Sequence, residues 1–213
     1  PDRPVGVASA HEMGGPHPYE SIPLDVAGYA MAAYLLVAHG LMLWKPAACK
    51  EWLHKLPRHH PAGIYTLAVG MIWFWLLIAP KNMGWISAIT MDIGEFNVVK
   101  PWLRYLVPIA FLGMVVYVKE FLFVRALGVI TLMVTGPLLE ASFNKDPGTR
   151  LLVPLFSYIL LTKGLFWVGM PFTFRDLVTW GTANDKRWRN LAYGGLAYGA
   201  VTLLCAILFW RGH

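Results

Sequence analysis

Charge is what this 213-residue chain has little of. Asp, Glu, Lys and Arg make up 14% of its residues, whereas a typical soluble domain carries about 25%. Hydrophobic residues account for 57%, and the mean hydropathy is +0.51. This composition excludes an ordinary soluble globular domain and predicts an integral membrane protein.

Cysteine is also sparse, and long polar segments are missing. The two cysteines, Cys49 in a loop and Cys205 in an apolar segment, are expected in different environments, which excludes a disulfide framework. No polar stretch is long enough to fold alone. We therefore expect an extramembrane N-terminal tail over residues 1–23 and a single transmembrane helical domain over residues 24–213.

Long apolar runs are what the chain has instead. About 20 helical residues cross a hydrocarbon core of about 30 Å. Six segments approach or reach that length, namely 24–44, 62–80, 102–118, 121–143, 151–171 and 191–210. Because only Lys119 and Glu120 separate the third from the fourth, five spans stay an alternative to six. The sequence predicts an all-α integral membrane protein, a polytopic bundle of about six transmembrane helices with short loops.

The distribution of Lys and Arg predicts the orientation, since cytoplasmic loops carry an excess of both. With six spans, one face carries ten of them and the other seven. The richer face is expected in the cytoplasm and both termini on the non-cytoplasmic side, in a prokaryotic plasma or inner membrane. The net charge of +6 is spread over these loops, which argues against nucleic acid as a partner and favours anionic lipid headgroups. The ten are Lys45, Lys50, Lys55, Arg58, Lys119, Arg125, Arg175, Lys186, Arg187 and Arg189.

Small residues mark two segments as candidates for close helix packing. Gly195 and Gly199 form a GxxxG pattern beside Gly194, and Gly28 and Ala32 have the same spacing in the first segment. Residues this small let two helix backbones approach closely inside a membrane. Packing within the chain and contact with another subunit both stay open.

Histidine is almost absent from the spans. His39 alone lies within one, so a haem held by two histidines of this chain is not expected. A chlorophyll-type pigment or one side of a haem shared with a partner stays open for His39, but a hydrogen-bonded interfacial histidine is favoured. No recognisable motif binds a cofactor, although bound lipids are expected.

The other histidines form neither an HExxH motif nor a helical pair at metal-ligand spacing. No metal site is predicted. His11, Met13 and His17 in the tail offer at most weak copper ligands.

Two carboxylates lie in the loop between the second and third segments. Asp92 and Glu95 are three residues apart, so on an interfacial helix they would share a face. Paired carboxylates can do acid/base work or gather cations, yet no nucleophile, metal-ligand histidine or glycine loop accompanies them. A solvated face is the favoured interpretation, and no catalytic residue is predicted.

Lys163 lies near the middle of the fifth segment, in the run YILLTKGLFWVGM. Its backbone is expected at least about 12 Å from the nearer membrane edge, and exposure to lipid would cost on the order of 3 kcal/mol. A protein partner is therefore expected. Glu140 is the nearest carboxylate but differs in depth by roughly 14 Å, while Thr131 and Thr135 lie nearer its level. A neutral amine, a lipid phosphate and a carboxylate of another subunit stay open.

These observations favour a non-catalytic accessory or structural subunit of a larger membrane complex, of an energy-converting type such as electron transport or photosynthesis. A small transporter or channel that uses Lys163 and Glu140 is the alternative. Against it stand the few charges and the lack of repeated halves with broken helices. The second alternative is an interfacial membrane enzyme that acts on lipid or quinone.

Overall fold

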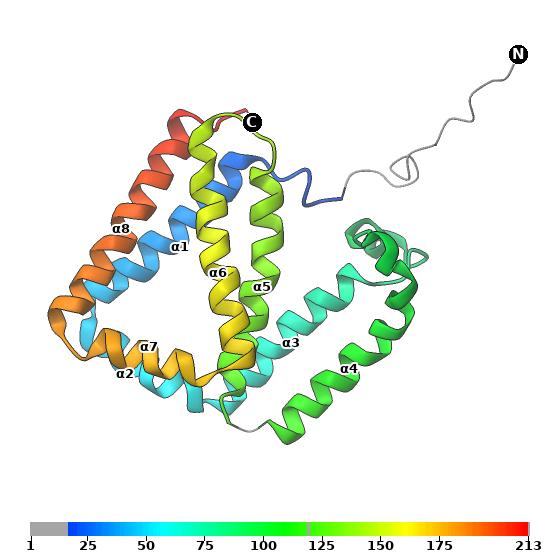
Figure 1. Ribbon diagram of the computed structural model, residues 1–213, viewed down its shortest axis with the longest axis horizontal. Coiled ribbons are helices and arrows are strands. Elements are labelled where there is room, and N and C mark those ends of the chain that lie inside the picture. Colours follow the sequence, from blue (N-terminus) through cyan, green and yellow to red (C-terminus); the bar gives the residue numbers. More distant parts are fainter. Residues whose placement is uncertain (1–16, 119, 213) are drawn as a thin grey trace, which may run out of the picture.

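The architecture is that of a helical membrane bundle (Figure 1), seen in a computed structural model that describes residues 17–118 and 120–212. Six helices of the described chain are long and apolar enough to span a membrane. The predicted fold class is thus confirmed. The six are α1 (Leu24–Trp44), α3 (His60–Leu77), α4 (Lys100–Tyr117), α5 (Leu122–Ser142), α6 (Leu152–Gly169) and α8 (Asp185–Leu208).

The chain turns sharply between the third and fourth predicted spans. Helix α4 ends at Tyr117 and α5 begins at Leu122. Phe121 caps α5 with a φ of 57°, in the left-handed region, where residues other than glycine are uncommon. The chain reverses direction there, so α4 and α5 are separate helices.

Two shorter helices occupy stretches that the sequence analysis treats as loops. They are α2 (Pro46–Lys55) and α7 (Phe172–Thr182). Pro46 stands at the first position of α2, where proline costs no hydrogen bond. The two helices touch each other at one end of the bundle, as amphipathic helices in a membrane interface would. We refer to this end as the α2/α7 end.

The opposite end carries short 3-10 helices and both ends of the described chain. η3 (Gly84–Ile89) and η4 (Gly94–Val99) connect α3 to α4, and η5 (Gly148–Leu151) leads into α6. At the α2/α7 end, η2 (Leu56–Arg58) leads into α3.

Of the predicted N-terminal tail, the structure describes residues 17–23, so His11 and Met13 lie outside the described residues. The indole N–H of Trp73 donates to the Tyr19 hydroxyl at 2.5 Å, and Nε2 of His17 donates to the carbonyl of Ile89 at 2.8 Å. Partial burial raises the pKa of the Tyr19 phenol. These contacts tie the segment before α1 to α3 and η3.

The spans pack in pairs. α1 lies along α8, and α5 lies between α6 and α3, whereas α4 packs less closely, with Phe111, Met114 and Val115 against the buried cluster around Leu67 of α3. The largest buried cluster joins α1, α5, α6 and α8 and includes Leu24, Met31, Leu138, Val153 and Trp210. The α1/α8 pair and the α5/α6 pair therefore meet through apolar side chains near the end opposite α2 and α7.

Candidate functional site

Lys163 lies on a defined face of α6. Phe156 precedes it by seven residues and Trp167 follows it by four, so the three share one side of the helix. The Phe156 ring lies 6.4 Å from that of Tyr198 on α8, and the Trp167 ring lies 5.3 Å from that of Phe174 on α7, centroid to centroid. Lys163 therefore sits between two aromatic contacts, on the side of α6 that faces α7 and α8.

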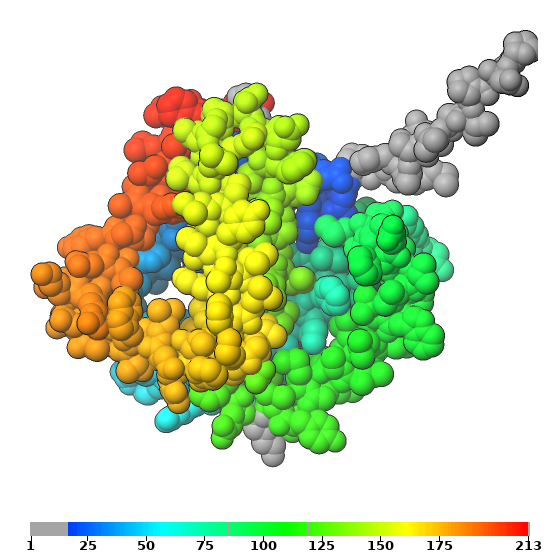
Figure 2. Space-filling model, in the orientation of Figure 1, coloured from blue at the N-terminus to red at the C-terminus, as the bar shows by residue number. Residues whose placement is uncertain are grey.

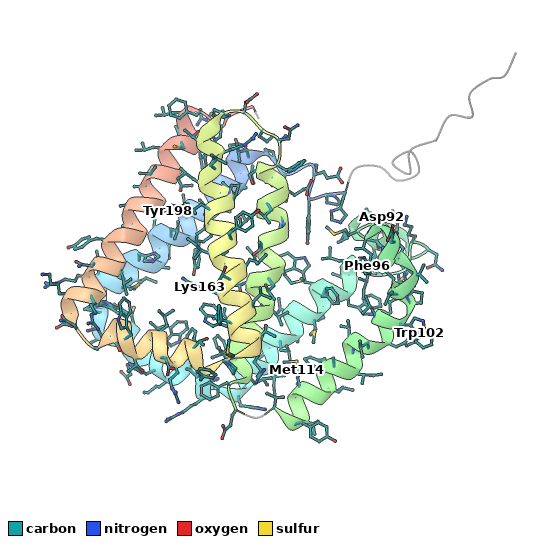
Figure 3. All side chains as sticks on the ribbon, in the orientation of Figure 1. Asp92, Phe96, Trp102, Met114, Lys163 and Tyr198 are labelled. Carbon is teal, nitrogen blue, oxygen red and sulfur yellow. The ribbon has the colours of Figure 1, made fainter. Side chains whose placement is uncertain are left out.

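An opening lies beside this face. Figure 2 shows it between α6, α7 and the α1/α8 pair, and Figure 3 labels Lys163 beside it. The side chain of Lys163 is exposed. Within residues 17–118 and 120–212, no hydrogen bond or ion pair of its amine is present. The cation thus faces the opening between α6, α7 and the α1/α8 pair.

The depth of Lys163 differs from the sequence-based value. Helix α6 ends at Gly169, because a residue that precedes proline, here Met170, is disfavoured in helical conformation. Lys163 thus lies six residues, or about 9 Å, from the end of its helix. This distance from the α2/α7 end is shorter than the expected value of about 12 Å, yet Lys163 still lies well inside the span.

The register of α5 against α6 fixes the relation to Glu140. A Cβ on Gly164 would touch Leu132 and Thr131 at about 3 Å, so Lys163 lies level with Leu132. Glu140 is eight residues farther along α5, which separates the two in depth by about 12 Å. Both side chains are exposed, and in the described part of the chain no ion pair joins them.

The two threonines near this level bind their own helix. The Thr131 hydroxyl donates to the carbonyls of Leu127 and Gly128, each at 2.8 Å, and the Thr135 hydroxyl donates to the carbonyl of Thr131 at 2.8 Å. Thr131 lies in the contact between α5 and α6, and Thr135 is buried. Their donors are thus already used at the helix that carries them.

His39 packs into the contact between α1 and α8. Its Nδ1 donates to the carbonyl of Leu35 at 2.8 Å, since a carbonyl can only accept. The ring edge that carries Nε2 rests on Gly195, where a Cβ would overlap the imidazole. The metal of a pigment or haem could therefore reach Nε2 only if α1 and α8 separated.

The other small residues of this pair have unequal surroundings. A Cβ on Gly28 would meet the Trp210 ring, and one on Gly199 would meet Leu35 at 3.0 Å. Ala32 is fully buried. A Cβ on Gly194 would meet nothing within 4 Å, so this residue faces away from the contact.

Asp92 and Glu95 do not form a joint carboxylate site. The Asp92 carboxylate accepts from the side-chain amide of Asn97 at 2.5 Å and from the backbone N–H of Gly94 at 2.9 Å. These two donors, in that order, hold the pKa of Asp92 below its usual range, with a smaller contribution from Lys81. Glu95 is exposed at the start of η4. Asp92 thus stabilises a turn in the segment between α3 and α4.

Two cations that the sequence analysis counts only as loop charges have specific partners. Lys100 is 4% exposed, and its amine donates to the carbonyl of Met91. Arg104 donates from Nε to the carbonyl of Ile78 at 2.7 Å and from Nη2 to that of Ala79 at 3.3 Å. Arg104 satisfies carbonyls just beyond α3, of which that of Ala79 also accepts from the Thr90 hydroxyl at 3.2 Å, and Lys100 satisfies one in the segment between η3 and η4. The i, i+4 spacing of Lys100 and Arg104 at the start of a predicted span was the sequence signal that could have indicated these contacts.

In the described ranges, no group of three His, Cys, Asp or Glu side chains could hold a metal ion. The chain matches no family model, no curated protein and no solved structure.

Proposed function

We propose that this chain is a non-catalytic accessory or structural subunit of a larger membrane complex, and that a partner subunit contacts α6 at Lys163. The exposed lysine within a span carries the proposal. In contact with lipid it would cost on the order of 3 kcal/mol. Because nothing in the described chain compensates it, a carboxylate or carbonyl of a neighbouring subunit is the natural partner.

The open packing of the bundle supports the same proposal. In an 18-residue apolar window of the stretch Gly94–Tyr117, which contains α4, 11% of the residues are buried, against 33% in the corresponding window of α5. Such a helix leaves room for a partner on several sides. We place the chain in a prokaryotic plasma or inner membrane with the α2/α7 end in the cytoplasm, because that end carries more Lys and Arg.

Purification in mild detergent followed by native mass and absorbance spectra tests the proposal. Co-purifying subunits are expected, and haem or pigment absorbance in the complex would point to an energy-converting assembly. A colourless monomer would contradict the proposal and favour a transporter or channel instead.

Lys163→Met is the sharper test. The complex is expected to weaken by roughly 30-fold or more, as when one member of a buried charged pair is removed. The isolated chain should melt at the same or a higher temperature, since a costly charge leaves the membrane. Lys186→Met, which removes an exposed charge at the α2/α7 end, is the matched control and should change neither. Normal assembly with lost activity would favour transport.

A further inference from the structure

A pocket of about 260 Å³ opens where the end of α3 meets the start of α4, lined by Trp75, Pro80, Pro101, Arg104 and Tyr105. It lies at the end opposite α2 and α7. Figure 3 labels Asp92 and Trp102 in the same part of the molecule. Aromatic rings and a cation at a span end are typical of the headgroup layer of a membrane.

Arg104 is held rigidly in the wall of this pocket. Two of its guanidinium nitrogens donate to the carbonyls of Ile78 and Ala79, and its own carbonyl accepts from the indole N–H of Trp75 at 3.3 Å. In the described part of the chain, the third nitrogen, Nη1, has no hydrogen-bond partner. A fixed guanidinium with an unused donor is suited to bind a phosphate oxygen.

Positive charge is in excess around the pocket. Lys81 and Arg104 both act electrostatically on Lys100, and Asp92 is the carboxylate that acts on it. That carboxylate already accepts hydrogen bonds from Asn97 and a backbone N–H. Arg104 is the charged side chain among the residues that line the pocket, and Lys81 follows the lining residue Pro80, so positive charge predominates at this site.

An exposed apolar surface continues from the pocket along α4. Its residues recur at helical spacing toward the α2/α7 end: Tyr105, Ile109, Leu112 and Val116. A soluble anion would make no use of this surface. A lipid would, because its acyl chains need an apolar path directly below the bound headgroup.

We propose that this pocket binds the phosphate of an anionic glycerophospholipid, with Arg104 and Lys81 facing the phosphate and the acyl chains along α4. Such a lipid covers the exposed face of α4, whereas Phe111, Met114 and Val115 on the other face pack against the buried cluster around Leu67 of α3. The inference is independent of the proposed subunit role.

Lipid retention by the purified full chain in detergent tests the proposal. Native mass spectra are recorded with phosphatidylglycerol and with phosphatidylcholine of identical acyl chains. Preferential binding of one phosphatidylglycerol is expected. Arg104→Gln should weaken it about fivefold, the effect of one basic residue near a lipid surface. Arg150→Gln, the same change in η5 at the same end of the bundle, should leave it unchanged.

Lys81→Gln separates binding from folding, because Arg104 also satisfies carbonyls at the end of α3. Lys81 is exposed, and within the described residues its amine has no hydrogen-bond partner. This variant should lose affinity for phosphatidylglycerol with an unchanged melting temperature. Equal retention of both lipids, or full retention in both variants, overturns the proposal. Displacement of the lipid by inorganic phosphate also overturns it, since the site would then bind a free anion.

Discussion

The α1/α8 pair and the α3/α4 pair show two ways in which apolar helices can lie in a membrane. α1 and α8 stand near opposite ends of the sequence and pack along their length, whereas α3 and α4 are consecutive spans that pack less closely (Figure 1). Both pairs are apolar, and lipid solvates apolar helices well. The difference lies in the contacts. The Trp210 ring, just after α8, packs against Gly28 of α1, and the His39 ring of α1 packs against Gly195 of α8. Close fit holds membrane helices together.

Removing a ring from the tight pair should have the largest effect. Trp210 is fully buried against Gly28, and its indole N–H donates to the Thr149 hydroxyl at 2.9 Å. Trp210→Ala should destabilise the chain by about 3–5 kcal/mol. Trp102→Ala on α4, where the residue is 77% exposed, should cost less than about 0.5 kcal/mol. Unfolding in detergent followed by circular dichroism measures both, and similar losses would contradict the comparison.

Adding a methyl group to the tight pair should have an intermediate effect. In Gly195→Ala the new Cβ overlaps the His39 ring, and such overpacking costs about 1–3 kcal/mol. Gly113→Ala is the matched control, because a Cβ on this α4 residue meets nothing within 4 Å. It should change stability by less than about 0.5 kcal/mol.

A double variant sharpens this result, since His39→Ala removes the ring that the new methyl group meets. The combination of Gly195→Ala with His39→Ala should be less destabilised than the sum of the two single variants. Additive losses, measured in the same unfolding assay, would show that the ring is not the source of the clash.

The smallest effect is expected in the segment that leads into α4. The Asp92 carboxylate has a pKa below its ordinary value of 3.8 because Asn97 and Gly94 donate to it. The contribution of this carboxylate to stability is therefore complete above the pKa that Asp92 has in the unfolded chain. It is lost as the pH falls through the lower pKa that Asp92 has in the folded chain. Amide hydrogen exchange of residues 92–97 should become faster over that acidic range, by more than the change in the intrinsic exchange rate.

Asp92→Asn should abolish this pH dependence, whereas Glu95→Gln, three residues on, should leave it intact. If Glu95→Gln abolished the pH dependence and Asp92→Asn did not, the prediction that Asp92 causes it would be wrong. The α1/α8 pair serves as an internal reference, because its exchange should not respond to either substitution.

Much of the architecture could be predicted from the sequence. The spans follow from apolar length, because a bilayer admits few other structures. Helices α2 and α7 were missed because they are short and mix charged with apolar residues. What faces Gly28 or Gly195 could not be predicted either: spacing marks a small residue, but the ring that fills the space comes from a distant part of the chain.

The candidate site was predicted less completely. Lys163 could be singled out, because a charge within a span is costly wherever it lies. The pocket beside Arg104 could not, since it depends on carbonyls that become free only where α3 ends, at Leu77. A cation near a span end is common as a headgroup anchor, and its sequence context alone does not reveal a specific acceptor.

The weak attachment of α4 has a mechanical consequence. Its 18 residues span about 27 Å, close to the thickness of an average hydrocarbon core, and a helix answers a mismatch in thickness by tilting. The α1/α8 pair is packed tightly, with the Trp210 ring against Gly28 and the His39 ring against Gly195, and would resist such a change. A thinner or thicker bilayer should therefore change the tilt of α4, which α3 and α5 hold mainly through Phe111, Met114 and Val115, more than that of α1 or α8.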